Sequence, residues 1–228
     1  MNARARRLAV TVAAVVGLVS ACGTSGYTYV TNQKDGLYLK VPDSWKVYTE
    51  SDFVGDLSAD EREDLRSRTW FRGFDAAADP STNHVVNRST SAPRGYAEVV
   101  KFDQEQREES SLETLRANGF SLVDTKTGEP VDPVRYAIDN PDGAVRILHY
   151  DDELTSGDGF RGIRITALVD VGTEPAYVLD QVTFVDVGTT KRYTLSIGCS
   201  PTCWTKNRKL LATIVDSWTL ENPSEKNK

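Results

Sequence analysis

The feature that most constrains the fold is a series of β-type segments in the second half of the sequence. The clearest segment covers residues 160–171, in which apolar and polar positions alternate and the apolar set is Ile163, Ile165, Ala167 and Val169. Strict alternation places such side chains on one face of a strand. Further β-rich runs are expected at residues 134–138, 144–150 and 175–187, and a last long strand at Tyr193, Leu195 and Ile197.

Strands are also expected near the start of the chain. Residues 27–30 alternate, residues 32–36 have the composition of a turn, and residues 37–41 place three apolar side chains on one strand face. Thr69-Trp70-Phe71 and residues 96–102 indicate two more strands. Residues 75–95 contain few apolar side chains and indicate a long surface loop.

Helical signals are fewer. The strongest is an apolar stripe at spacings i, i+3, i+4 and i+7, formed by Leu211, Ile214, Val215 and Trp218. Residues 58–61 and 110–113 have the Ser-x-x-Glu pattern that opens short helices. Many strands joined by short turns, with few helices, predict an α+β fold whose central, largely antiparallel sheet is flanked by helices.

The first 21 residues have the pattern of an export signal. Three arginines precede an apolar run from Leu8 through Ala21, whose 14 residues fall short of the ~20 needed to span a bilayer. The run ends in small residues and Cys22, so Val19-Ser20-Ala21-Cys22 resembles the lipobox of bacterial lipoproteins. The Cys22 thiol would then carry the lipid. The alternative is an ordinary secretory signal with an incidental cysteine.

This interpretation divides the chain into four parts. We expect a signal peptide at residues 1–21, a short tether at 22–26, one globular domain at 27–220 and a polar, disordered tail at 221–228. The lipidated protein would lie on the outer face of the cytoplasmic membrane. At ~3.5 Å per residue the tether reaches roughly 18 Å, so the domain would stay close to the headgroups.

The charge balance restricts the partners. Without residues 1–21 the chain has 24 Lys or Arg and 33 Asp or Glu, a formal charge of −9. Nucleic-acid binding requires a basic surface, so this class of function is excluded. Adhesion to anionic lipid by overall charge is disfavoured as well, which leaves membrane attachment to the lipid anchor.

Two cysteines remain after Cys22. Cys199 and Cys203 enclose only Ser-Pro-Thr, and in an exported protein this spacing predicts a disulfide. Free thiols are one alternative. Zinc is the other, but it requires four ligands, and His84 and His149 are the two histidines that could complete the set.

The search for catalytic motifs gives little. The sequence has no nucleophile elbow, no phosphate-binding glycine loop and no His-Glu-x-x-His helix. His84 lies in the expected surface loop and is interpreted as solvated. His149, Asp151 and Glu153 would share one face of a strand and form a weak candidate cation site, but an acidic strand end facing water is the favoured interpretation. We therefore expect neither a cofactor nor a catalytic residue.

Both ends of the chain resemble the PsbP-like fold and the LpqN-type lipoproteins of actinobacteria. Residues 35–45 are similar to the family's opening strand, with glycine, an apolar strand, Val-Pro and tryptophan. Residues 192–195, Trp204 and residues 214–220 are similar to its closing strand, helix and serine-aromatic ending. The resemblance implies an α/β/α sandwich and a binding or assembly role, and it transfers no functional residue.

Taken together, these features predict a non-enzymatic binding or assembly module at the cell envelope, with a protein partner or a small ligand. The first alternative is a carrier of a lipid or another hydrophobic ligand, which would need a large apolar cavity. The second is a hydrolytic or metal-dependent enzyme, in which His149 would have to converge with carboxylates or with Cys199.

Overall fold

The computed structural model of the 228-residue chain describes residues 26–221, except 56–57, 88–89, 118–119, 121, 124–126, 157–158 and 173. Cys22 and the expected signal, like nearly all of the expected tail, lie outside these residues. None of the helices in the described ranges combines the length and apolar character of a membrane span.

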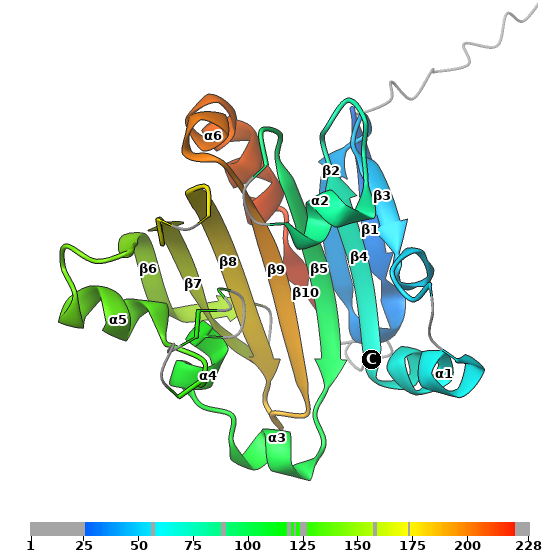
Figure 1. The fold of residues 1–228 in the computed structure, drawn as a ribbon. Coiled ribbons are helices and arrows are strands. Elements are labelled where there is room, and N and C mark those ends of the chain that lie inside the picture. The colour runs from blue at the N-terminus through cyan, green and yellow to red at the C-terminus, as the bar shows by residue number, and fades with distance from the viewer. Residues whose placement is uncertain are drawn as a thin grey trace, which may run out of the picture.

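The fold is α+β with two antiparallel sheets (Figure 1). The strands of the large sheet are, in spatial order, β3 (Lys46–Thr49), β4 (Thr69–Asp75), β5 (Arg94–Lys101), β9 (Lys191–Cys199), β8 (Tyr177–Asp186), β7 (Phe160–Val169) and β6 (Val145–Ser156). The small sheet consists of β1 (Tyr27–Asn32), β2 (Leu37–Pro42) and β10 (Thr219–Leu220). The predicted fold class is therefore confirmed.

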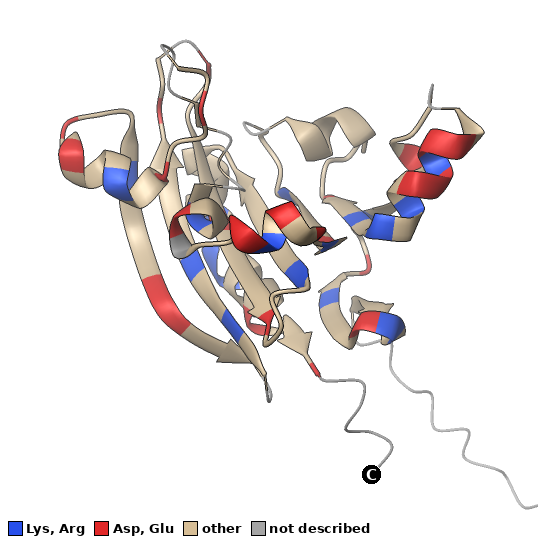
Figure 2. Ribbon diagram, turned by 90° about the horizontal axis from the view of Figure 1, so that it is seen from below, with Lys and Arg blue, Asp and Glu red and all other residues tan. Residues whose placement is uncertain are grey.

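The helices are mostly short. They are α1 (Ala59–Arg68), α2 (Thr82–Val86), α3 (Gln104–Glu108), α4 (Leu112–Ala117), α5 (Pro133–Asp139) and α6 (Pro201–Asp216), with 3₁₀ turns at Gln33–Asp35 and Glu50–Asp52. The predicted capping box at Ser58 and Glu61 opens α1. Several acidic side chains lie on α1 and α3, at the outside of the molecule (Figure 2).

One apolar cluster fills the space between the large sheet and a layer made of α6 and the small sheet. Leu39 of β2, Leu195 of β9 and Ile214 of α6 are fully buried there. The predicted stripe of the last helix is thus buried as expected, although Trp218 lies just after the end of α6. This arrangement modifies the implied sandwich, because the opening hairpin pairs with β10 in a separate sheet.

A second apolar cluster covers the opposite face of the large sheet. Ile163, Ile165 and Ala167 of β7 are fully buried, as their alternation predicts. They pack with side chains of α4 and α5, including Leu115 and Val134. The two faces of β7 and β8 pack against different layers. Each side chain of these strands therefore points toward one layer or the other.

Two sequence expectations are wrong. Residues 134–138 form most of the helix α5, because Asp132 accepts hydrogen bonds from the backbone N–H groups of Val134 and Arg135 and Pro133 occupies the first turn. Residues 75–95 are not all loop: Ser81 caps the short helix α2, and β5 already begins at Arg94.

Candidate functional site

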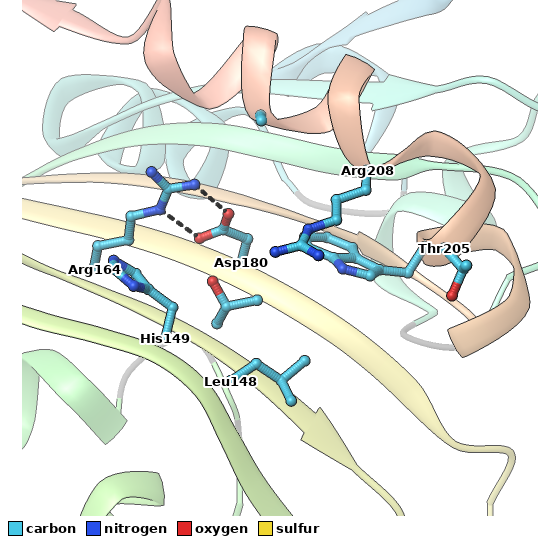
Figure 3. A pocket seen from close by; sticks show the side chains of 9 residues that line it. Leu148, His149, Arg164, Asp180, Thr205 and Arg208 are labelled. Atoms are coloured by element: carbon cyan, nitrogen blue, oxygen red, sulfur yellow. Dashed lines mark hydrogen bonds and ion pairs between the residues drawn. The ribbon is translucent and has the colours of Figure 1, made fainter.

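A surface groove lies where α6 leaves the outer strands of the large sheet uncovered. Since the odd-numbered side chains of β7 point into the second cluster, Arg164 and Thr166 point to the α6 side. The groove has a volume of about 700 Å³ (Figure 3) and is lined by Leu148, His149, Arg164, Thr166, Asp180, Trp204, Thr205, Arg208 and Ala212.

An ion pair forms the floor of this α6 groove. Arg164 donates from Nε to Asp180 Oδ1 at 3.1 Å and from Nη2 to Asp180 Oδ2 at 2.8 Å. The Asp180 side chain is 3% exposed and that of Arg164 is 23% exposed. Burial opposes the charged guanidinium, but the hydrogen bonds and charge of Asp180 outweigh it and raise the pKa of Arg164. The Arg164 guanidinium is therefore held in its charged form.

Further cationic and apolar groups form the walls. Arg208 and Trp204 extend from the same side of α6, while Leu148 and His149 come from β6. Figure 3 shows His149, Arg164 and Arg208 grouped around Asp180. Arg208 is exposed and forms no ion pair with a carboxylate of the described residues. The groove thus offers one uncompensated guanidinium beside an indole and an aliphatic side chain.

The expected strand cluster of His149, Asp151 and Glu153 does not form a cation site. His149 and Asp151 pair in register with Thr166 and Arg164 of β7, but the pairing shifts between Asp151 and Leu154, so the alternation is interrupted at Glu153. Asp151 instead accepts a hydrogen bond from the backbone N–H of Glu153 at 3.0 Å. Across the described ranges, no three His, Cys, Asp or Glu side chains are grouped closely enough to hold a metal ion.

The predicted disulfide is present and supports the groove. Cys199 at the end of β9 is bonded to Cys203 in the first turn of α6, with Cα atoms 5.9 Å apart, and both residues are buried. Ser200 caps the helix through the N–H of Cys203. The bond links the first turn of α6 to the end of β9. It thereby holds in place the part of α6 that contributes Trp204 to the groove.

His84 differs from its expected solvated state. Its Nδ1 lies 2.7 Å from Oδ2 of Asp75, whose side chain is buried. Asp75 also accepts hydrogen bonds from the backbone N–H groups of Ala77 and Ser81. This arrangement organises the turn before α2, so His84 has a structural role.

Sequence reasoning missed the principal residues of the groove. The available sequence signal was that Arg164 and Asp180 are isolated charges within apolar strand segments. Their pairing depends on the register between β7 and β8, which the sequence does not show. Trp204 is half-buried, packs against the first apolar cluster and also lines the groove. Cys22, the predicted lipidation residue, lies outside the described residues.

Comparisons with known proteins give matches to solved structures. No protein-family model matches the sequence, and no curated protein matches it. Cyanobacterial PsbP (CyanoP) from Synechocystis sp. PCC 6803 is 12% identical, with a TM-score of 0.47, over 90% of this chain and 98% of that chain. The Ran-binding protein Mog1p from Saccharomyces cerevisiae is 8% identical, with a TM-score of 0.40, over 85% and 95% of the two chains. A PsbP is thus among the matched structures.

Proposed function

We propose that this chain is a lipid-anchored binding module on the outer face of the cytoplasmic membrane, and that its α6 groove receives an anionic group of a partner. The lipobox-like Val19-Ser20-Ala21-Cys22 supports the anchor. The exposed Arg208, which has no ion-pair partner in the described part of the chain, carries the proposal for the groove.

The chemistry of the groove favours an anion beside an apolar group. A guanidinium presents several N–H donors in one plane and suits a carboxylate or a phosphate. Trp204, Leu148 and Ala212 provide apolar surface next to it. Such a mixture of a few polar groups and apolar walls is typical of ligand sites.

The same residues favour binding over catalysis. Asp180 is engaged by two hydrogen bonds from Arg164, which gives its carboxylate a structural role. His149 is exposed and has no hydrogen bond to a described side chain that would orient it. A carrier of a hydrophobic ligand would be expected to have an apolar cavity, whereas His149, Arg164, Asp180 and Arg208 all line this groove.

Photo-crosslinking in intact cells tests the groove. A photoreactive residue replaces the exposed Thr205 in the full-length protein, and a matched probe replaces Arg135 on α5, at a distance from the groove. We expect a reproducible adduct from position 205 that is absent from position 135.

Charge variants on α6 decide whether the adduct reflects the proposed contact. Arg208→Gln should remove it, while Lys209→Gln, one residue further on and outside the groove lining, should retain it. An adduct that survives Arg208→Gln, or that both variants lose equally, would contradict anion recognition by Arg208.

A further inference from the structure

The outer face of the small sheet carries an exposed aromatic surface. Val30, Leu39 and Val41 point into the first apolar cluster, so their neighbours along β1 and β2 point outward. These outward side chains, called the tyrosine face below, are Tyr27, Tyr29, Tyr38 and Lys40. They lie in the layer opposite α4 and α5 (Figure 1).

The side chains of the tyrosine face contact one another and remain accessible. Tyr29 is 51% exposed and Tyr38 is 40% exposed. Their ring centroids are 5.4 Å apart, and Lys40 Nζ lies 5.0 Å from the ring centroid of Tyr27. Tyrosine is enriched at contact surfaces, and adjoining exposed rings on one sheet face form a patch of that kind.

A second hollow adjoins this face. It has a volume of about 630 Å³ and is lined by Thr31, Gln33, Gly36, Leu37, Tyr38, Thr219 and Glu221. Hydroxyl, amide and carboxylate groups surround it, together with the Tyr38 ring. A polar hollow beside exposed phenol rings suits the headgroup region of a membrane, where polar groups adjoin apolar acyl chains.

The position of the face in the chain identifies what it contacts. Tyr27 follows Cys22 by five residues, which reach at most roughly 18 Å when extended. We infer that the tyrosine face lies against the headgroups of the membrane that holds the anchor. This inference rests on the proposed lipid anchor at Cys22. Tyrosine rings suit this boundary because the ring enters the apolar side while the hydroxyl stays hydrated. Lys40 would approach the phosphates of the same lipids.

This contact orients the domain. With the tyrosine face on the membrane, the opposite layer of α4 and α5 points away from it. Lipid chains on Cys22 would hold the protein at the surface, and the tyrosine face would limit its rotation about the tether.

Fluorescence quenching in vesicles tests the orientation. Full-length protein is reconstituted in phosphatidylcholine–phosphatidylglycerol vesicles that contain a lipid with a nitroxide on its headgroup. A bimane probe is attached at Thr31→Cys beside the tyrosine face, or at Ile138→Cys on α5, where the side chain is 73% exposed. We expect quenching several times stronger at position 31 than at position 138.

A variant of the face provides the second comparison. Tyr29→Ser combined with Tyr38→Ser should reduce quenching at position 31 to the level of position 138. Val187→Ser, which changes an exposed side chain outside the tyrosine face and its hollow, should leave it unchanged. The two probes in the otherwise unchanged protein decide the question even if the tyrosine variant fails to fold.

Mass spectrometry of the same samples separates the two proposals. Equal quenching at positions 31 and 138 in protein that carries acyl chains would overturn the membrane contact and leave the anchor standing. Protein without acyl mass would overturn both the anchor and the inference that rests on it.

Discussion

At the scale of single residues, the Arg164–Asp180 pair is expected to contribute to stability. Asp180→Asn keeps the shape of the side chain but removes its charge, which leaves a half-buried guanidinium without its bidentate partner. We expect a loss of about 3 kcal/mol in the free energy of unfolding. Urea unfolding measures it.

The control for this change is Glu113→Gln. Glu113 lies 3.9 Å from Arg135, and the two side chains are 58% and 72% exposed. Such exposed pairs contribute within about 0.5 kcal/mol. Similar small effects of both substitutions would show that the Arg164–Asp180 pair does not hold the groove floor.

Tyr193 should affect stability at alkaline pH. Burial raises the pKa of its phenol, and the charges of Asp35 and Asp186 raise it further. Above the ordinary value of 10.0, the unfolded chain releases this proton while folded Tyr193 retains it. The folded state then binds more protons, so its stability is intact below that pH and falls as the pH rises further.

Tyr193→Phe separates this ionisation from packing. Phenylalanine retains the ring that contacts Phe160, whose centroid lies 5.3 Å away. We expect little change near neutral pH and a shallower loss of unfolding free energy between about pH 9 and pH 11. Unfolding curves across this range measure the slope, and an unchanged slope would contradict the assigned role of the phenol.

At the scale of elements, α6 joins the small sheet to the large one. Ile214 is fully buried in the cluster between them, whereas Lys209 is exposed on the same helix. Ile214→Ala should destabilise the protein by ~2–4 kcal/mol, as for other buried aliphatic side chains. Lys209→Ala should change stability by less than about 0.5 kcal/mol. Equal denaturation midpoints would mean that α6 is not docked through this stripe.

Sequence periodicity predicted those elements whose burial repeats along the chain. The alternation from Ile163 to Val169 and the apolar stripe of α6 each correspond to side chains buried on one face of the element. It failed for residues 134–138, where Val, Tyr and Ile favour a strand but the Asp132–Pro133 cap starts a helix. It also missed α2, a helix of five residues whose preceding turn depends on hydrogen bonds to the buried side chain of Asp75.

The candidate site was less predictable than the elements. Local alternation suggested that His149, Asp151 and Glu153 share a face, but the pairing with β7 shifts register between Asp151 and Leu154, so Glu153 lies in the irregular part of β6. This shift depends on the partner strand and leaves no local pattern. The disulfide was predictable because Cys199 and Cys203 are so close in sequence that any sharp turn brings them together.

At the scale of the whole molecule, the groove and the tyrosine face both follow from how the layers are placed. The opening hairpin pairs with β10 from the other end of the chain and so forms a separate sheet beside α6. That layer leaves part of β6 and β7 open as the α6 groove. The groove has no continuous sequence pattern, because it combines β6, β7, β8 and α6, whereas the tyrosine face lies within the single β1–β2 hairpin.

Attachment of this domain to the membrane through Cys22 is tested most directly by fractionating cells that make the wild type or Cys22→Ala, with intact mass spectrometry of each protein. Each buried CH₂ of an acyl chain contributes ~0.8 kcal/mol, and two chains suffice for stable anchoring. We predict wild-type protein in the membrane pellet with added acyl mass, and Cys22→Ala in the soluble fraction. Cys199→Ala combined with Cys203→Ala should still enter the pellet. A wild type without acyl mass, or Cys22→Ala retained in the pellet, would contradict a lipid-anchored binding module.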